Sequence, residues 1–387
     1  GFDMSQVCKS ARENMVSTDK MPLAPHEFAL MDMLFSNSEA FLSRPQPGYE
    51  TCRYVFFPGC QAGAIAPDVV MQAYEDLSNR VDRGVALMLG CCGAISEWAG
   101  RYEMTEKVNE QLKQELAKLG DPIIIAGCPS CMKQLKESIG AHVIGIWEIL
   151  REIGLPQQAK GLEIPVAIHD ACGARGDAQT QDMIRQLLSD MGCIVEDTEY
   201  SRDLSPCCGY GGLTAYANKD MAAKMTEKCL ERSDAPYITY CMACRDRFAR
   251  EGRESRHILE LLYGANVSNM PDISEKRYNR LILKQTLLKN IWNEEPIMEK
   301  KDYTVAYTEE AIHMMDERMI LKSDVERVLS DYRENQEAIF DEETKELVTR
   351  SRLGNVTFWV RFVETEEGYL VRRAYSHRMN IMKRVGQ

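Results

Sequence analysis

The sequence lacks several features that would identify common classes of protein. No apolar run approaches the roughly 20 residues of a membrane-spanning helix, since the longest runs resemble "PIIIAG" and "VIGIWEIL". The formal net charge is −12 and no basic stripe stands out, so we expect no nucleic-acid ligand. The polar stretch "GFDMSQVCKSARENMV" contains no secretory signal, and we expect a cytoplasmic protein without a direct membrane span.

Nucleotide-binding motifs are missing as well. Neither a G-x-G-x-x-G fingerprint nor a phosphate-binding loop occurs, and "CGYGGLTA" has its glycines at the wrong spacing. We therefore expect this chain to bind neither NAD nor flavin. The chain begins with Gly1 rather than Met, which leaves open what precedes it.

Cysteine, in contrast, is abundant, with 14 residues. A chain of this size does not need disulfides to stabilise its core, so reduced thiols that bind metal or react are expected. Ten cysteines form two matching sets with the patterns C-x30-CC-x35-C-x2-C and C-x34-CC-x32-C-x2-C. The first set is Cys60, Cys91, Cys92, Cys128 and Cys131, and the second set is Cys172, Cys207, Cys208, Cys241 and Cys244.

The residues around the two sets repeat too, as "CCGA" and "CCGY" show. Self-similarity at a fixed offset indicates a duplicated unit, so we expect two domains of one fold related by approximate two-fold symmetry. Short apolar runs such as "YVFF" and "YITY" lead into the cysteines, and helix-like segments follow them. This alternation predicts an α/β fold with parallel sheets and with the cysteines gathered at the carboxyl ends of the strands.

Five cysteines in each set exceed what simple metal sites use. A structural zinc ion and an ordinary iron–sulfur cubane each take four ligands. A cluster with several iron atoms can use the fifth thiolate, and Gly93 and Gly209 give the backbone the freedom to turn two adjacent thiolates toward one object. Two zinc sites with spare thiols, or buried structural cysteines, are the alternatives. We interpret the unmatched Cys8, Cys52, Cys193 and Cys229 as small buried hydrophobic residues.

The motifs "FFPGC…LGCCG…GCPSC" and "HDACG…PCCGYGG…YCMAC" resemble the cysteine-rich CCG domain, over about residues 52 to 260. Two copies of this domain build the cysteine-rich subunit of heterodisulfide reductase and the equivalent half of its two-subunit form. Related pairs occur in iron–sulfur subunits of glycerol-3-phosphate, glycolate and lactate oxidising systems. The resemblance implies two tandem pseudo-symmetric Rossmann-like CCG domains, each set of five cysteines carrying one noncubane [4Fe-4S] cluster.

The resemblance also implies a function and partners. The chain would be the iron–sulfur subunit of a redox complex that reduces a small disulfide or thiol substrate at the two clusters, with electrons from a flavoprotein and ferredoxin-type clusters. A pure electron-transfer subunit without chemistry of its own is the second hypothesis, and a zinc-stabilised scaffold is the third. The opening "GFDMSQVCKSAR" resembles the stretch after the last cysteine of a ferredoxin-type region, which we expect upstream or in a neighbouring subunit.

Three residues near the second set have two interpretations each. His169 could move protons to a departing thiolate as a catalytic residue, whereas the pair His169 and Asp170 more often only orders a strand end and caps a helix. Arg175 either attracts an anionic substrate or is simply solvated. Many relatives have proline where this chain has Ala171, so the turn into the second set is expected to differ.

The sequence outside the two cysteine sets has a different residue pattern, which divides the chain into further segments. We predict a helical amino-terminal segment at 1–50, the two CCG domains at 51–160 and 161–268, a helical linker at 269–302, and a carboxyl-terminal α+β module at 303–387. In this module the spacing of Ser323 and Glu326 predicts a capping box, with Val325, Val328, Leu329 and Tyr332 on one helical face.

The alternation on both sides of "TEEG" in the same module predicts a β-hairpin. Trp359, Arg361, Arg372 and Arg373 would suit docking to another protein, since interfaces enrich tryptophan and arginine. The alternative is that the aromatic residues face the module's own core and the arginines face water.

Overall fold

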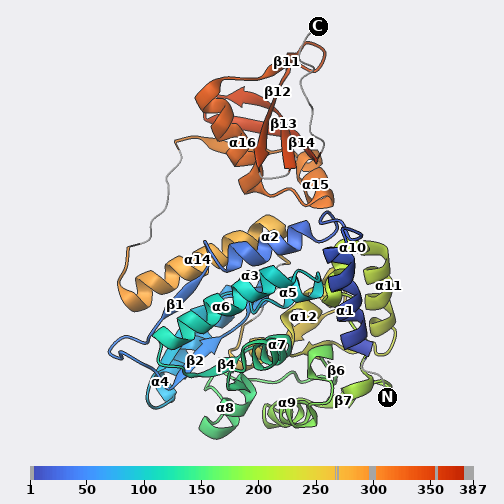
Figure 1. The fold of residues 1–387 in the computed structure, drawn as a ribbon. Coiled ribbons are helices and arrows are strands. Elements are labelled where there is room, and N and C mark those ends of the chain that lie inside the picture. Colours follow the sequence, from blue (N-terminus) through green and yellow to red (C-terminus); the bar gives the residue numbers. More distant parts are fainter. Residues whose placement is uncertain (1–3, 266, 268–269, 296–301, 354–355, 379–387) are drawn as a thin grey trace. The chain divides into compact units, whose positions relative to one another are not determined.

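The computed structural model describes residues 4–265, 267, 270–295, 302–353 and 356–378 (Figure 1). The chain divides into two compact units, Gly1–Met270 with Lys276–Pro296, and Pro271–Glu275 with Ile297–Gln387. Within the described residues, no helix combines the length and the apolar character needed to cross a bilayer.

The first sheet has five strands in the order β1-β3-β2-β4-β5. Strands β2 to β5 run parallel, and β1 pairs antiparallel with β3 at the edge. All residues of β2 and β3 are buried, as expected for a parallel sheet with helices on both faces. The strands are β1 (Leu42–Arg44), β2 (Tyr54–Phe57), β3 (Val85–Leu89), β4 (Ile123–Ala126) and β5 (Val143–Gly145), and the helices are α3 (Cys60–Ile65), α4 (Pro67–Arg80), α5 (Ala94–Trp98), α6 (Tyr102–Lys118), α7 (Pro129–Ile139) and α8 (Ile146–Ile153).

The second sheet repeats this arrangement with four parallel strands in the order β7-β6-β8-β9. In both sheets the first parallel strand of the repeat lies between the second and the third, so the expected duplication of an α/β unit is confirmed. The strands are β6 (Val166–His169), β7 (Val195–Asp197), β8 (Tyr237–Thr239) and β9 (Ser255–His257). The helices are α9 (Ala178–Asp190), α10 (Thr214–Ala217), α11 (Lys219–Leu230), α12 (Met242–Arg250) and α13 (Ile258–Leu262), with short 3₁₀ turns η1 (Cys172–Ala174), η2 (Arg202–Leu204) and η3 (Gly211–Leu213).

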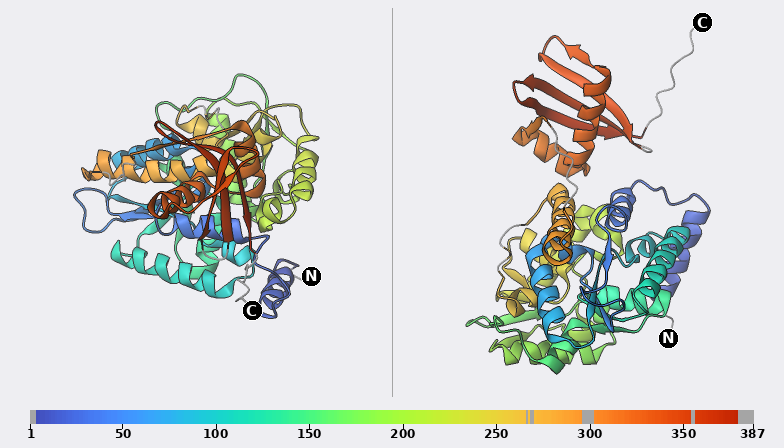
Figure 2. Two further views of the ribbon diagram at one scale, coloured as in Figure 1. Left: turned by 90° about the horizontal axis from the view of Figure 1, so that it is seen from above. Right: turned by 90° about the vertical axis from the view of Figure 1, so that its left-hand side faces the viewer.

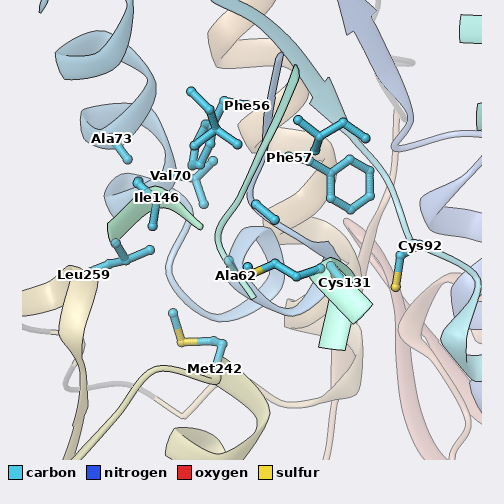
Figure 3. Packing of buried hydrophobic residues seen from close by; sticks show 14 of the residues in the cluster. Phe56, Phe57, Ala62, Val70, Ala73, Cys92, Cys131, Ile146, Met242 and Leu259 are labelled. Atoms are coloured by element: carbon cyan, nitrogen blue, oxygen red, sulfur yellow. The ribbon is translucent and has the colours of Figure 1, made fainter. Parts of the chain in front are cut away.

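The two repeats share one hydrophobic core. Met242 and Leu259 of the second repeat belong to the same buried cluster as Ala62 and Ile146 of the first repeat, and Figure 3 labels all four side chains. The ring of Trp147 also meets the ring of Tyr240 edge-on, with centroids 6.1 Å apart. Packing across the repeats therefore fixes the position of one sheet relative to the other.

Helices outside the repeats complete the first unit. These are α1 (Met4–Ser17), α2 (Glu27–Ser36) and, from Lys276 onward, α14 (Ile273–Trp292). Figure 1 shows α2 beside α14, and Asp32 of α2 accepts hydrogen bonds from Arg277 and Arg280 of α14. These contacts join segments that are about 250 residues apart in the sequence.

The second unit is built on a five-stranded sheet in the order β10-β14-β13-β12-β11. β10 runs parallel to β14, and the other pairs are antiparallel. Helix α15 packs against β14, and α16 packs against β12 and β13 (Figure 2). The strands are β10 (Thr304–Tyr307), β11 (Ile339–Asp341), β12 (Glu346–Leu353), β13 (Val356–Thr365) and β14 (Gly368–His377), and the helices are α15 (Glu309–Arg318) and α16 (Lys322–Asn335).

The predicted hairpin in this unit is confirmed, because β13 and β14 pair antiparallel on both sides of a two-residue turn. The four residues predicted to share the inner face of α16 are all buried. The predicted capping residues are wrong: the helix begins at Lys322, so Asp324 occupies the third position, and its carboxylate accepts from the N–H of Leu321 at 2.9 Å. Ser323 and Glu326 each lie too far into the helix for the predicted roles.

Trp359 faces away from the helices of this unit, because its neighbour Val360 points into the core and adjacent strand residues face opposite sides. Its ring stacks on Tyr375 at 6.0 Å, and its Nε1 donates to His377 Nε2 at 2.9 Å. Arg361 pairs with Glu346 and Asp341. Arg372 and Arg373 are exposed, so their use in docking stays a prediction.

Candidate functional site

The first cysteine set lies at the carboxyl ends of β2, β3 and β4. Cys60 opens α3, directly after Gly59, whose φ of 87° places it in a conformation that favours glycine. A β-carbon on Gly59 would also lie 3.3 Å from the sulfur of Cys131. Cys91 and Cys92 follow β3, and Gly93, with φ of 87°, turns the chain into α5. Cys128 precedes α7, and Cys131 lies in the first turn of that helix.

The second set lies at the equivalent ends of β6, β7 and β8. Cys172 opens η1, Cys207 and Cys208 lie in the longer loop after β7, and Cys241 and Cys244 stand before and within the first turn of α12. Gly209 takes the role of Gly93, with φ of 89°, and a β-carbon there would lie 2.6 Å from the carbonyl oxygen of Ala222.

The ten sulfurs form one connected chain of thiol–thiol contacts. In the second set the Sγ atoms of Cys244 and Cys208 are 3.2 Å apart. The two sets meet where the side chain of Cys128 contacts that of Cys241. The order of contacts is Cys60, Cys91, Cys92, Cys131, Cys128, Cys241, Cys244, Cys208, Cys207 and Cys172.

These contacts impose different protonation on neighbouring sulfurs. Hydrogen bonds from Cys131 and Cys91 lower the pKa of the Cys92 thiol to about 6, and the N–H of Ala94 assists. Hydrogen bonds from Cys172 and Cys208 lower the pKa of Cys207 to about 2, and Gly209 N–H donates to its sulfur at 3.4 Å. Closely packed thiolates concentrate negative charge that a bound cation would offset.

Within the described part of the chain, no three His, Cys, Asp or Glu side chains form a group able to hold a metal ion as they stand. Five sulfurs per set are one more than a tetrahedral zinc ion takes, and a centre with several metal atoms can use the fifth. The donor chemistry therefore fits an iron–sulfur cluster better than a tetrahedral zinc ion.

His169 ends β6 beside the second set. It is 4% exposed, its ring packs edge-on against Phe248 at 4.8 Å, and burial lowers its pKa to about 4. Its Nε2 has no hydrogen-bond partner among the described residues. It is therefore a buried neutral imidazole, and a role in proton transfer stays a prediction.

Asp170 and Arg175 order the loops around the second set. The carboxylate of Asp170 accepts from Arg185 at 3.0 and 2.8 Å, from the hydroxyl of Tyr240 at 2.9 Å and from the N–H of Arg202 at 2.6 Å. The exposed Arg175 donates to the carbonyl oxygen of Ser205, two residues before Cys207.

Sequence reasoning missed His257, which ends β9 and is 1% exposed. Its Nδ1 accepts from the N–H of Leu259 at 3.2 Å, so Nε2 carries the proton, and no acceptor pairs with Nε2 within the described residues. Burial lowers the pKa of His257 to about 4, and the negative charge of the nearby Cys128 opposes this shift. Aligning "SRHILELL" with "VIGIWEIL" would have singled it out, because the repeat has Gly145 at that place.

An ion pair missed by sequence reasoning lies behind the first set. Arg280 donates to both carboxylate oxygens of Asp32, at 2.8 and 3.0 Å, and to the carbonyl oxygen of Cys60 at 2.9 Å. Both side chains are largely buried. The second cysteine set contributes to this region through Tyr210, whose hydroxyl pairs with that of Tyr216.

A cavity of about 60 Å³ opens at the junction of the sets. All five cysteines of the first set line it, and Cys241 is the one cysteine of the second set on its wall. The rest of the wall comes from α3, α5, the start of α7, the start of α12 and Tyr210.

Of the four unmatched cysteines, Cys52, Cys193 and Cys229 are buried as expected. The expectation is wrong for Cys8, which is exposed. Helix α1 turns Arg12 and Glu13 toward the first repeat, where their backbone meets Gly100, and Cys8 lies on its solvent side.

Comparison with known protein families also finds two copies of one domain in this chain. The cysteine-rich domain family named CCG matches residues 54–136 and 166–248, so the chain contains two CCG domains. An uncharacterized iron–sulfur protein of Methanococcus maripaludis is 26% identical over 206 residues, which cover 50% of this chain and 40% of that protein. An uncharacterized iron–sulfur protein of Methanocaldococcus jannaschii is 26% identical over 180 residues, which cover 45% and 35%. The chain thus spans about two fifths of these relatives, and no solved structure matches it.

Proposed function

We propose that this chain with two CCG domains is an iron–sulfur subunit that reduces a small disulfide at two noncubane [4Fe-4S] clusters, one on each set of five cysteines. The observation that carries the proposal is the contact between Cys128 of the first set and Cys241 of the second, because a disulfide that is divided between two clusters needs both sets at one place. The names of the two relatives support the iron–sulfur assignment.

The clusters, when bound, supply stored electrons and iron sites with affinity for sulfur. The chain's own residues hold the thiolates at the strand ends, and Gly93 and Gly209 set the turns that point adjacent sulfurs the same way. The N–H groups of Ala94 and Gly209 lie beside Cys92 and Cys207 and offset their charge. Burial of Cys91, Cys92, Cys131, Cys208 and Cys244 keeps water from half of the ten sulfurs.

The reaction requires two electrons and two protons: R–S–S–R′ + 2 e⁻ + 2 H⁺ gives R–SH and R′–SH. Since the sequence contains no nucleotide-binding motif, we propose that a partner delivers the electrons, as a flavoprotein with ferredoxin-type clusters would. The ferredoxin-type region is either upstream in the same polypeptide or in a neighbouring subunit.

The proposal is tested by electron paramagnetic resonance on anaerobically purified protein after oxidation in the presence of small thiols. A new paramagnetic signal that depends on the thiol supports chemistry at the clusters. Protein that contains the clusters but gives no response to any thiol would instead be an electron relay, which is the alternative function.

A further inference from the structure

We propose that the open face of the carboxyl-terminal sheet docks an acidic segment of a partner protein. The open face is the side of β12, β13 and β14 that lies opposite the helices α15 and α16. The proposal goes beyond the proposed function, because this unit contains no cysteine and takes no part in holding a cluster.

Both helices of this unit pack on one side of the sheet. Ala311 of α15 and Val328 of α16 belong to one buried cluster with Val360 of β13 and Val371 of β14. Because successive strand residues face opposite sides, the neighbours of these core residues lie on the other side. In the described part of this unit no helix covers that side, as is common for antiparallel sheets with one solvated face.

The central row of the open face consists of Arg350, Trp359 and Tyr375, which lie directly opposite one another on three adjacent strands. The guanidinium of Arg350 lies over the Trp359 ring, 5.0 Å from its centroid. From the strand on the other side, the ring of Tyr375 stacks on Trp359 with centroids 6.0 Å apart. Arg350 is exposed and has no carboxylate partner among the described residues. The tryptophan ring therefore supports a guanidinium whose charge is not neutralised.

A β-bulge gathers further arginines beside this row. The register of β13 and β14 shifts after Arg361, so Arg372 and Arg373 of β14 both lie opposite this one residue. Arg361 pairs with two carboxylates, and Arg373 pairs with Glu310 at 2.9 Å. Arg372 is exposed and, like Arg350, has no carboxylate partner in the described part of the chain. The open face thus carries two arginines whose positive charge is available to a ligand.

The rows on either side of the central row have the composition of an interface. Arginine, tryptophan and tyrosine are enriched where proteins meet, whereas Lys, Asp and Glu are depleted. None of the nine positions in the three rows is Lys, Asp or Glu, although a face that serves only solubility usually carries charges of both signs. One flanking row is Val348, Arg361 and Arg373, and the other is Arg352, Thr357 and His377.

The chemistry of the open face favours carboxylates over nucleic acid. A guanidinium binds a carboxylate through two parallel hydrogen bonds, and Arg350 and Arg372 both have this capacity unused. Single-stranded nucleic acid binds largely through bases that stack on free aromatic rings. The ring of Trp359 is already contacted by Arg350 and Tyr375 from the strands on both sides, so it offers no free face to a base.

The spacing of the two unpaired arginines sets the length of the partner segment. Arg350 and Arg372 lie two strands apart and about one row apart along the strands, which corresponds to about 12 Å between their backbone positions. An extended chain covers this distance in about four residues. A peptide of six glutamates is therefore long enough to reach both arginines.

The first test is fluorescence anisotropy on the full chain with labelled hexaglutamate, hexaserine and hexauridylate. Hexaglutamate should bind, and its affinity should fall about tenfold between about 50 mM and about 500 mM salt, because salt screens exposed ion pairs. Hexaserine should not bind. Absence of hexaglutamate binding, or tighter binding of hexauridylate, would overturn the proposal.

The second test uses single substitutions to locate the binding. Arg350→Gln and Arg372→Gln should each weaken hexaglutamate binding about fivefold, the upper end of what an exposed ion pair contributes. The matched control is Arg318→Gln, which removes an exposed arginine from α15 and should change the affinity less than about twofold. Equal affinities for the three variants would mean that the peptide binds elsewhere, and the proposal would fail.

The third test separates the support of Arg350 by Trp359 from charge alone. Trp359→Leu removes no charge, but it takes away the ring under the guanidinium, so it should weaken hexaglutamate binding about threefold. Trp359→Phe keeps an aromatic ring and should restore most of the affinity. A Trp359→Leu protein that binds hexaglutamate as tightly as the unaltered chain would contradict this role of the tryptophan.

Discussion

Replacing Arg280 by methionine should destabilise the first unit through Asp32. The substitution removes hydrogen bonds of 2.8 and 3.0 Å from a carboxylate that is only 14% exposed, and it leaves the Cys60 carbonyl oxygen without this donor. Breaking a buried ion pair from one side costs about 3–5 kcal/mol. Because Arg277 still contacts Asp32 at 3.2 Å, we expect about 3 kcal/mol, the lower end of that range.

The cost should depend on pH in a defined direction. Burial raises the pKa of Asp32, but Arg280 and Arg277 together outweigh burial and hold this pKa below its usual range. The stability that the pair contributes is therefore fully present above the unfolded-state pKa of about 4 and is lost as pH falls through the lower folded-state value. Without Arg280 the pKa of Asp32 rises, so its carboxylate becomes protonated at higher pH and the difference between the two proteins shrinks as pH is lowered from about 7 toward about 4.

The assay is hydrogen exchange by mass spectrometry on the full chain, read at peptides from α3 and α14. A local readout is needed because a chain with two units and bound clusters does not unfold in one step. Adding Asp32→Asn to Arg280→Met should recover part of the loss, since the uncompensated charge is then gone. A loss below about 1 kcal/mol, or a difference that stays constant with pH, would refute this reasoning.

Two further predictions concern other parts of the chain. Gly209→Ala should remove about half of the iron. Gly209 has φ of 89°, and a β-carbon there would lie 2.6 Å from the Ala222 carbonyl oxygen, so the substitution strains the backbone of the second set only. A full iron content by elemental analysis would contradict this prediction. Phe362→Ala should destabilise the carboxyl-terminal unit by about 3–5 kcal/mol, because Phe362 is fully buried. Hydrogen exchange in β13 measures this loss of stability. The iron content of the chain should not change.

The repeat and its sheets were predictable because the evidence for them is local. Each apolar run of three to five residues makes a strand, each following amphipathic segment makes a helix, and a cysteine at the junction must lie at the carboxyl edge of the sheet. The hairpin of the second unit follows from alternation in the same way.

Features that depend on the relative position of distant segments could not be predicted. The contact between Cys128 and Cys241 depends on how two sheets pack, and periodicity carries no information about that rotation. The pairing of Asp32 with Arg280 joins helices 248 residues apart, and β1 joins the first sheet from a segment expected to be helical. His257 was missed because a single histidine in a strand has no signature of its own, and only an alignment of the two repeats sets it apart from Gly145.

The most direct test of whether each set of five cysteines holds one four-iron cluster is the iron and acid-labile sulfide content of anaerobically purified protein. We predict about eight irons and about eight sulfides per chain, the sum of two [4Fe-4S] clusters. Zinc in place of iron, or about four irons per chain, would contradict two four-iron clusters.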